Sequence, residues 1–268
     1  AGLWGKNLVR NFHDMGVLGA VVEPTASRRE ELKAENPEAQ ILEKFEDALE
    51  ADVQGVAICT PVPLHYEMAK AALEAGKDVF VEKPITYSSA DAEDLVKLAQ
   101  ANDRILMVGH LLMYQPAINW IKEFMQSGKL GDLYGVRHER LGLGRARPVE
   151  NVLWDMGVHD LAVMLYLVGE EPGAIRASGH RLLQPGIEDD VHVHIEFPGG
   201  IRGNLHASWL WPFTERRLIV RGSKAMLVYD EVAQTVTLHN KGITKELENR
   251  DEGSEVLYHG HAQPLRLE

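Results

Sequence analysis

The chain has 268 residues, of which 45% are hydrophobic, so it is long enough to bury a sizeable core and to form two domains. Its formal net charge of -12 argues against nucleic acid or an anionic membrane as the main partner. The single cysteine, Cys59, cannot form an internal disulfide and no apolar stretch approaches the length of a membrane span, so we expect a cytoplasmic protein whose partner is a small molecule.

The chain opens with a glycine-containing turn, Ala1-Gly2-Leu3-Trp4-Gly5. Its two glycines have the spacing of the last two in G-x-G-x-x-G, whose backbone lets a pyrophosphate approach a helix N-terminus. Apolar periodicity predicts a helix over 7–15 and a strand over 17–22. The strand ends at an acid 21 positions after Gly2, where a Rossmann unit places its ribose-binding carboxylate. An ordinary glycine turn is the alternative. The residues predicted to bind the dinucleotide here are Gly2, Leu3, Trp4, Gly5 and Glu23.

Helices and strands then alternate as far as Gly109. Capping residues precede two of the helices, with Thr25 or Ser27 before the first and Ser88 or Ser89 before the last. Strands that alternate with helices predict an α/β fold with a parallel, doubly wound Rossmann-like sheet. The predicted helices cover 27–35, 63–75 and a segment after residue 88, and the predicted strands cover 53–59, 78–81 and 105–108.

The strand over 78–81 runs into Glu82-Lys83-Pro84. Proline cannot donate to a sheet ladder, so the strand must stop there. Lys83 is therefore predicted to lie at the carboxyl end of a parallel strand, where open α/β sheets bind their ligands. Its ammonium group can hold a substrate hydroxyl or a developing oxyanion there. A surface lysine at a strand end is the alternative for this tripeptide taken alone.

The pattern changes after Gly109. Helices are predicted near 116–126 and 153–167, and Pro198-Gly199-Gly200 has the chemistry of a hairpin turn. We therefore predict a dinucleotide-binding domain over 1–109 and a second α+β domain, built on a largely antiparallel sheet, over 110–268. Its predicted strands cover 133–141, 175–183, 191–197, 201–211, 216–221, 225–229 and 235–239.

Residues 154–160 contain a second group of candidate catalytic side chains. Asp155 and His159 are four positions apart, so on a helix they share a face. A carboxylate beside an imidazole can fix its orientation and raise its basicity, and histidine is suited to move protons near neutral pH. Gly157 is a poor helix former and therefore indicates close backbone approach. A capped helix start with a hydrogen-bonded histidine is the alternative.

Five motifs follow one another along the chain: the glycine turn, Thr60-Pro61-x-x-x-His65, Glu82-Lys83-Pro84, Gly109 and Asp155-x-Gly-x-His159. In this order they resemble the motifs of the Gfo/Idh/MocA family of NAD(P)-dependent oxidoreductases, over essentially the whole chain. The resemblance implies that Lys83 and His159 are catalytic and that Asp155 positions the substrate. It also implies NAD, or alternatively NADP, as cofactor, and a second domain that carries the substrate site and an oligomerisation sheet. The residues that would line the nicotinamide side are Thr60, Pro61, His65, Glu82 and Lys83.

The resemblance sets expectations for both ends of the chain. The family's first strand and first motif glycine would precede Ala1, and a further helix would follow Glu268. We therefore expect a dinucleotide-binding sheet without its first strand.

The stretch over 140–154 is similar to the branch of the family that acts on UDP-linked N-acetylated amino sugars. Arginines gather near it in an otherwise acidic chain, and guanidinium groups suit a diphosphate or a carboxylate. Arg137 and Arg140 fall on opposite strand faces, so at most one of them is needed. The alternative is that these arginines lie on a solvated strand face and in a loop and bind no ligand. The residues predicted to contact the substrate are Arg145, Arg147, Asn151, Trp154, Asp155 and His159.

Other histidines, at positions 192, 194, 206, 259 and 261, do not lead us to predict a metal site. His192 and His194 share a strand face, but we find no cysteine or acidic partner that completes a zinc-binding spacing. We expect these side chains to lie on a strand surface or to line a pocket.

The sequence therefore predicts a dehydrogenase that transfers a hydride between a sugar carbinol, on a UDP-linked N-acetylated amino sugar, and a nicotinamide cofactor. His159 would take the hydroxyl proton while Lys83 polarises the oxygen. The alternatives are a dehydrogenase of a free polyol, inositol or sugar, and a non-catalytic NAD-binding regulator on the same fold. Trp209, Trp211 and Phe213 cluster in the sequence of the second sheet, which predicts a homodimer or homotetramer.

Overall fold

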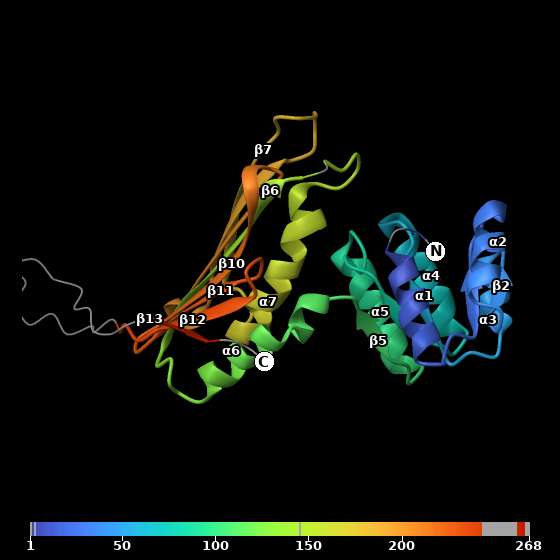
Figure 1. The fold of residues 1–268 in the computed structure, drawn as a ribbon, viewed down its shortest axis with the longest axis horizontal. Coiled ribbons are helices and arrows are strands. Elements are labelled where there is room, and N and C mark those ends of the chain that lie inside the picture. The colour runs from blue at the N-terminus through green and yellow to red at the C-terminus, as the bar shows by residue number, and fades with distance from the viewer. Residues whose placement is uncertain (1, 3, 145, 243–261, 266–268) are drawn as a thin grey trace, which may run out of the picture. The chain divides into compact units, whose positions relative to one another are not determined.

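The computed structural model describes residues 2, 4–144, 146–242 and 262–265 and divides the chain into two compact units, Ala1–Gly109 and His110–Glu268 (Figure 1). Each unit is considered by itself. Two predicted site residues, Leu3 and Arg145, and the histidines at 259 and 261 lie outside the described residues. Among the residues the structure describes, no helix is long and apolar enough to cross a membrane.

In the N-terminal unit every strand pair is parallel, which confirms the predicted α/β class. The strands lie in two sheets, β1-β2 and β3-β4-β5, because no strand of the described residues joins β1 to β3. The strands are β1 (Ala20–Val22), β2 (Gln40–Leu42), β3 (Gly55–Ile58), β4 (Asp78–Val81) and β5 (Leu106–Val108). The helices are α1 (Gly5–Asp14), α2 (Ala26–Glu35), α3 (Phe45–Glu50), α4 (His65–Glu74) and α5 (Ser89–Ala101), with a 3₁₀ turn at Val62–Leu64.

Local signals explain where several of these elements begin and end. Gly16 follows α1 with φ +69°, a left-handed conformation that favours glycine. Ser88 is the cap of α5, since its side chain accepts a hydrogen bond from the Asp91 N–H at 3.3 Å. Thr25 occupies the N-cap position of α2 but makes no side-chain capping bond.

The core of this unit packs α4 and α5 against the three-stranded sheet. Val79 and Val81 of β4 are at most 2% exposed and contact Leu73 of α4 and Leu95 of α5 within one apolar cluster. This packing fixes the carboxyl ends of β3, β4 and β5, which are the ends that carry the predicted motifs.

The C-terminal unit is built on an eight-stranded sheet with the order β13-β12-β11-β10-β6-β9-β8-β7. Among the described strands of this sheet only β6 and β9 pair in parallel, so the predicted largely antiparallel sheet is confirmed. Its strands are β6 (Leu133–Leu143), β7 (Ala174–His180), β8 (Asp190–Glu196), β9 (Arg202–Ser208), β10 (Leu210–Gly222), β11 (Met226–Asp230), β12 (Thr235–His239) and β13 (Ala262–Leu265). The helices are α6 (Pro116–Gln126) and α7 (Val158–Val168), with 3₁₀ turns at Leu111–Tyr114 and Pro198–Gly200.

Helices α6 and α7 lie on one face of this sheet, and the described residues place no helix on the other (Figure 1). Alternate residues of β8 and β9, such as Val193 and Leu205, pack with Met164 of α7 in a single core. The Lys122 ammonium on α6 donates to the carbonyl of Tyr166 at 2.7 Å and satisfies part of the C-terminal end of α7. The position of α7 matters for function because the predicted catalytic histidine lies near its start.

The three aromatic residues predicted to form one patch lie on different faces of the sheet. Trp209 is 1% exposed and belongs to the core, whereas Phe213 is 59% exposed. Inward-facing residues have odd numbers in β9, so His206 faces outward, and the Trp211 ring lies edge-on to the His206 ring with centroids 5.8 Å apart. Trp211 and Phe213 contact each other, with ring centroids 6.2 Å apart, and only these two can contribute to an outward-facing patch.

Candidate functional site

The carboxyl ends of β3, β4 and β5 bring three predicted motifs to one edge of their sheet. The parallel register aligns the last residues of the three strands, Ile58, Val81 and Val108. Parallel α/β sheets bind their ligands at this edge. The motifs that follow the three strands are Thr60-Pro61, Glu82-Lys83-Pro84 and Gly109.

The Glu82 carboxylate is held from two sides at this edge. The indole Nε1 of Trp4 donates to its Oε1 at 2.5 Å, and the backbone N–H of Lys83 lies 3.3 Å from its Oε2. A Cβ on Gly109 would stand 3.0 Å from that carboxylate, so glycine makes room for it. Glu82 therefore connects the glycine turn, the end of β4 and the end of β5, and half-buried Lys83 follows directly.

His65 braces the same edge from inside the unit. It is 1% exposed, with Nδ1 2.9 Å from the carbonyl oxygen of Pro84 and Nε2 2.8 Å from that of Thr60. Both ring nitrogens contact this chain's own carbonyls, so His65 acts on a ligand through the two loops that it joins. The Lys83–Pro84 peptide between these groups is cis.

The described residues predicted for the adenosine half of a dinucleotide lie directly after β1 and at or just before the start of α1. Glu23 directly follows β1, is 3% exposed and accepts the Thr25 N–H at 3.0 Å. Arg28 lies 4.0 Å from the same carboxylate. Gly5 is buried in the first turn of α1, and a Cβ on Gly2 would meet no atom within 4 Å. The Lys6 and Asn7 N–H groups donate to the carbonyls of Gly2 and Trp4, so what the ten-residue helix offers a pyrophosphate is mainly the positive end of its dipole beside an open glycine.

In the C-terminal unit, a π-helical turn over Leu153–Gly157 directly precedes α7, and the sequence did not predict it. Asp155 lies in this turn and half-buried His159 in the first turn of α7, so their offset differs from the simple shared face of an α-helix. The close approach predicted at Gly157 is confirmed, because an added Cβ would lie 2.8 Å from Leu153 Cδ1 and 3.1 Å from Leu205 Cδ2. Glycine therefore allows the turn to pack directly on β9.

Both oxygens of Asp155 have partners in this unit. The Arg147 Nε lies 3.1 Å from Oδ1, and the indole Nε1 of Trp209 donates to Oδ2 at 3.3 Å. The Asp155 side chain is 15% exposed and that of Arg147 is 50% exposed. Arg147, predicted to contact the substrate, is thus attached to the predicted positioning aspartate.

Asn151 joins the start of the helix to the loop before β8. Its Oδ1 accepts the N–H of Trp154 at 3.1 Å, and its Nδ2 donates to Glu188 Oε2 at 2.9 Å. Arg181 lies 2.6 Å from the other oxygen of Glu188, and the hydrogen bonds from Asn151 and Arg181 lower the pKa of Glu188. Glu188 and Arg181 were not predicted from the sequence because neither residue belongs to a recognisable motif.

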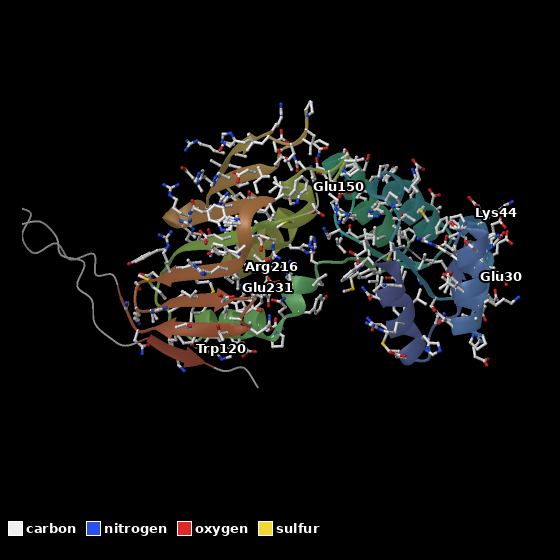
Figure 2. The ribbon with its side chains drawn as sticks, turned by 45° about the horizontal axis from the view of Figure 1, so that its top comes forward. Glu30, Lys44, Trp120, Glu150, Arg216 and Glu231 are labelled. Atoms are coloured by element: carbon white, nitrogen blue, oxygen red, sulfur yellow. The ribbon has the colours of Figure 1, made fainter. Side chains whose placement is uncertain are left out.

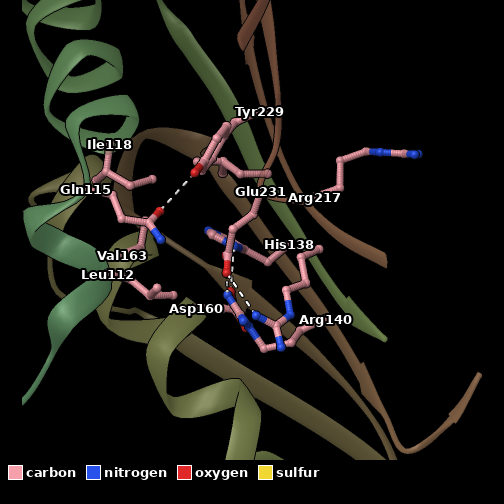
Figure 3. A pocket seen from close by; sticks show the side chains of 12 residues that line it. Leu112, Gln115, Ile118, His138, Arg140, Asp160, Val163, Arg217, Tyr229 and Glu231 are labelled. Atoms are coloured by element: carbon pink, nitrogen blue, oxygen red, sulfur yellow. Dashed lines mark hydrogen bonds and ion pairs between the residues drawn. The ribbon is translucent and has the colours of Figure 1, made fainter. Parts of the chain in front are cut away.

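The residue after His159, Asp160, anchors α7 to the sheet through a buried network (Figure 3). Its Oδ2 accepts Arg140 Nε at 2.6 Å, and its Oδ1 lies 3.1 Å from His138 Nδ1. Arg140 also contacts Glu231 at 2.9 Å, and Glu231 contacts Arg216 at 3.2 Å (Figure 2). Although burial opposes ionisation of Asp160, Arg140 and His138 lower its pKa to about 2.

The predicted arginine cluster is therefore not one patch. Arg140 is buried in the network, where the carboxylates of Asp160 and Glu231 raise its pKa against the effect of burial. Arg137 lies on the other strand face and pairs with Glu139 at 2.5 Å. Arg147 is the member of this group that the structure brings to Asp155.

Comparisons with known protein families agree with these motifs. Residues 1–110 match the model of an oxidoreductase family with an NAD-binding Rossmann fold, GFO_IDH_MocA, and residues 118–228 match the GFO/IDH/MocA C-terminal domain. The chain belongs to the Gfo/Idh/MocA family. Its N-terminal unit is accordingly the NAD-binding Rossmann unit of a Gfo/Idh/MocA oxidoreductase.

Individual relatives within the Gfo/Idh/MocA family carry several names. UDP-N-acetylglucosamine 3-dehydrogenase of Acidithiobacillus ferrooxidans is 30% identical over 197 residues, which cover 73% of this chain and 61% of that protein. Inositol 2-dehydrogenase of Corynebacterium glutamicum is 28% identical over 191 residues, covering 69% and 57%. The chain therefore spans less than two thirds of the length of either relative. A solved structure of the Acidithiobacillus enzyme matches with a TM-score of 0.83 at 24% identity, covering 100% of this chain and 80% of that one.

Proposed function

We propose that this protein is an NAD-dependent dehydrogenase that transfers a hydride between a nicotinamide cofactor and a sugar carbinol of a UDP-linked N-acetylated amino sugar. The observation that carries the proposal is the position of Lys83, which directly follows Glu82 at the carboxyl end of β4, in loops braced by His65. An ammonium group held at that edge suits an oxygen that gains negative charge as a carbinol is oxidised.

The side chains have distinct roles in this proposal. Lys83 holds the carbinol oxygen, His159 accepts the hydroxyl proton, and Asp155 orients the substrate or the imidazole. Arg147 and Trp209 keep the Asp155 carboxylate in one orientation. The nicotinamide, when bound, supplies the hydride acceptor.

The N-terminal unit would hold NAD through separate groups. Gly2, Gly5 and the start of α1 receive the pyrophosphate, and Glu23 accepts hydrogen bonds from the adenosine ribose. A carboxylate at that place repels a 2′-phosphate, so we expect NAD to be preferred over NADP, with Arg28 at 4.0 Å reducing the preference. Thr60, Pro61 and Glu82 follow β3 and β4 at the edge assigned to the nicotinamide.

The nucleotide-sugar substrate rests on two lines of support. One relative at 30% identity is named a UDP-N-acetylglucosamine 3-dehydrogenase. Half-exposed Arg147 also lies next to Asp155, where a guanidinium group can reach an anionic part of a substrate. Arg145, Asn151 and Trp154 complete the proposed contacts.

A free polyol or inositol is the second candidate substrate. Relatives named inositol 2-dehydrogenase match at 28% identity, and the Arg147 guanidinium already has a carboxylate partner. The non-catalytic regulator is less well supported because such a protein has no need of Lys83 and His159, and this chain has both.

An absorbance assay at the band of reduced nicotinamide, run with a panel of UDP-sugars and free polyols, separates these functions. We expect turnover with a UDP-linked N-acetylated amino sugar, and a KM for it that rises roughly ten-fold or more in Arg145→Ala, with NAD binding unchanged. If the parent protein oxidises only uncharged sugars, the polyol dehydrogenase replaces the nucleotide-sugar enzyme. Absence of turnover with the whole panel would favour the regulator.

We also infer that the protein assembles as a homodimer or homotetramer through the helix-free face of its second sheet. Phe213 is 59% exposed on that face and contacts Trp211, and exposed aromatic groups often mark an interface. Sedimentation of the full chain at micromolar concentration tests this, and a species that is only monomeric would contradict it.

A further inference from the structure

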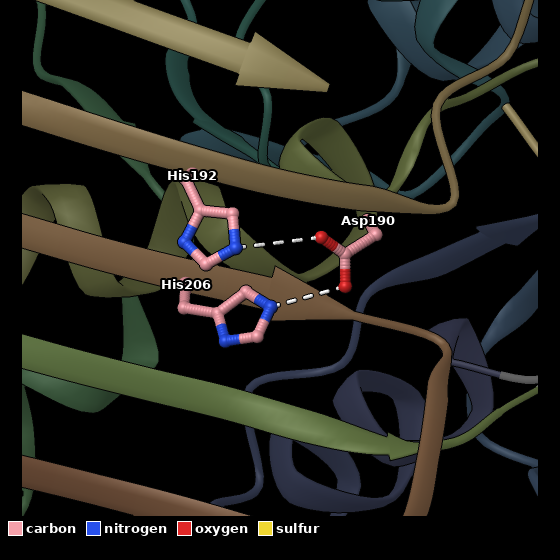
Figure 4. Close-up of side chains that lie close together, drawn as sticks. All are labelled: Asp190, His192 and His206. Carbon is pink, nitrogen blue, oxygen red and sulfur yellow. Dashed lines mark hydrogen bonds and ion pairs between the residues drawn. The ribbon is translucent and has the colours of Figure 1, made fainter. Parts of the chain in front are cut away.

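A second cluster of side chains with metal-binding chemistry lies on the outward face of the eight-stranded sheet (Figure 4). It consists of Asp190 and His192 on β8 and His206 on β9. Val191 and Leu205 point into the core on the other side, so the alternation of each strand directs the three cluster residues outward. The cluster lies on β8 and β9, whereas Asp155 and His159 lie in the π-helical turn and in α7. The chemistry proposed for the cluster also differs from that proposed for Asp155 and His159.

The strand register brings the three side chains together. His192 and His206 are direct partners across β8 and β9, and Asp190 precedes His192 by two positions on the same face. His206 Nε2 lies 3.0 Å from Asp190 Oδ2, and His192 Nε2 lies 3.6 Å from Asp190 Oδ1. The two Nε2 atoms and the carboxylate converge on one side of the rings, and one ligand atom from each residue lies within 4.8 Å of the others (Figure 4).

The strands hold two imidazole rings and one carboxylate in direct contact. The imidazole rings are stacked with centroids 3.9 Å apart and an interplanar angle of 15°, and two protonated rings at that separation would repel each other. A cation between the two Nε2 atoms and the carboxylate would satisfy all three groups at once.

We propose that Asp190, His192 and His206 form a binding site for a divalent transition metal of the Zn²⁺ class. Imidazole nitrogens suit zinc, nickel, copper and iron, whereas magnesium and calcium prefer oxygen ligands alone. Metal–ligand bonds of about 2.0–2.2 Å in a tetrahedral site place neighbouring ligand atoms roughly 3.3–3.6 Å apart, which is near the 3.0 and 3.6 Å between the imidazole nitrogens and the carboxylate here. The side chains of Asp190 and His206 are 20% and 15% exposed and that of His192 is 43% exposed within a single chain, so the sheet supports the site. The His206 ring also contacts that of Trp211, so the site lies beside the aromatic residues proposed to form the subunit interface.

The sequence analysis did not predict this site because it sought an acidic partner by zinc-finger spacing. Asp190 stands two positions before His192, and its relation to His206 depends on a register that only the folded sheet supplies. His194, which shares the strand face with His192, instead contacts Asn204 at 2.8 Å and is not part of the cluster. It therefore provides a matched control.

Calorimetric titration of the full chain with Zn²⁺, after treatment with a chelator, tests the proposal. We expect saturable binding that weakens at least ten-fold in His192→Gln and is unchanged in His194→Gln. Co²⁺ should give a visible absorption band that is lost in the same variant. Equal Zn²⁺ affinity of the parent and His192→Gln, or an equal loss in the control, would overturn the proposal.

A measurement on the unaltered protein removes any dependence on how a variant folds. Carbethoxylation of histidines, located by peptide mass spectrometry, should be slowed by Zn²⁺ at His192 and unaffected at His194. Modification of His192 at the same rate with and without Zn²⁺ would refute the site. Neither experiment depends on dehydrogenase activity, so the metal site and the proposed function can fail separately.

Discussion

Replacing Asp160 by asparagine tests how firmly α7 is anchored. The substitution keeps the shape of the side chain and removes one negative charge from a site that is 2% exposed. Arg140, with its side chain 7% exposed, would retain only Glu231 as a carboxylate partner. Removing one partner of a buried pair costs about 3–5 kcal/mol because the remaining charge stays desolvated. Since Glu231 remains, we expect a loss of about 3 kcal/mol in the free energy of unfolding at neutral pH.

The pKa of Asp160 gives an independent check on this magnitude. Its value falls from an ordinary 3.8 to about 2 in the folded protein, so between these pH values the unfolded chain binds more protons. The stability that the carboxylate contributes is therefore fully present above pH 4 and is lost as the pH falls through about 2. A difference of this size corresponds to about 2–3 kcal/mol. The gap between the parent and Asp160→Asn should therefore be present above pH 4 and close as the pH falls through about 2.

Urea unfolding followed by tryptophan fluorescence measures that gap, because Trp209 lies in the core of the same unit. Glu170→Gln, at an exposed site just after α7, is the control and should change the free energy of unfolding by less than about 0.5 kcal/mol. The reasoning is refuted if Asp160→Asn costs less than about 1 kcal/mol at pH 7, or if the gap persists unchanged at pH 2.

Substitutions at four further residues test the proposed function. Lys83→Ala or His159→Ala should lower kcat by roughly 10²-fold or more and leave NAD affinity within a few-fold of the parent. Normal turnover in either variant would exclude the replaced residue from the catalytic mechanism. Glu23→Gln should narrow the preference for NAD over NADP in cofactor titrations, and a parent protein that already binds NADP more tightly would contradict the role of Glu23. Arg147→Ala should raise the KM for a UDP-sugar roughly ten-fold by removing a charged contact, while Arg147→Lys should recover part of it; an unchanged KM would exclude Arg147 from the substrate site.

Much of the fold could be predicted because local signals and tertiary packing agree. The strand over 78–81 and the helix over 116–126 begin and end where they were predicted, since one is an apolar run and the other starts at a proline. β2 and α3 were missed because three and six residues are too few to show a period. The π-helical turn was missed for another reason, because it depends on how Gly157 packs against β9.

The candidate site was predictable as a set of motifs and not as a set of contacts. The spacing of Asp155 and His159 indicated the correct helix start, but the attachment of Arg147 and Trp209 to Asp155 needs chain segments that only folding brings together. Arg140 and Asp160 are twenty positions apart and carry no shared motif, so their pairing could not be inferred. His65 was predicted from its motif, yet its position beneath the loops follows from burial.

The brace at His65 has a consequence for redesign of the protein. The imidazole contacts its two loops through the main-chain carbonyl oxygens of Thr60 and Pro84. Every amino acid carries a main-chain carbonyl oxygen. Side chains of these loops can therefore be exchanged without deleting either hydrogen bond, provided that the backbone keeps its path. A combinatorial library at positions 60 and 61 could thus change the side chains near Lys83, while the backbone that positions the lysine stays in place.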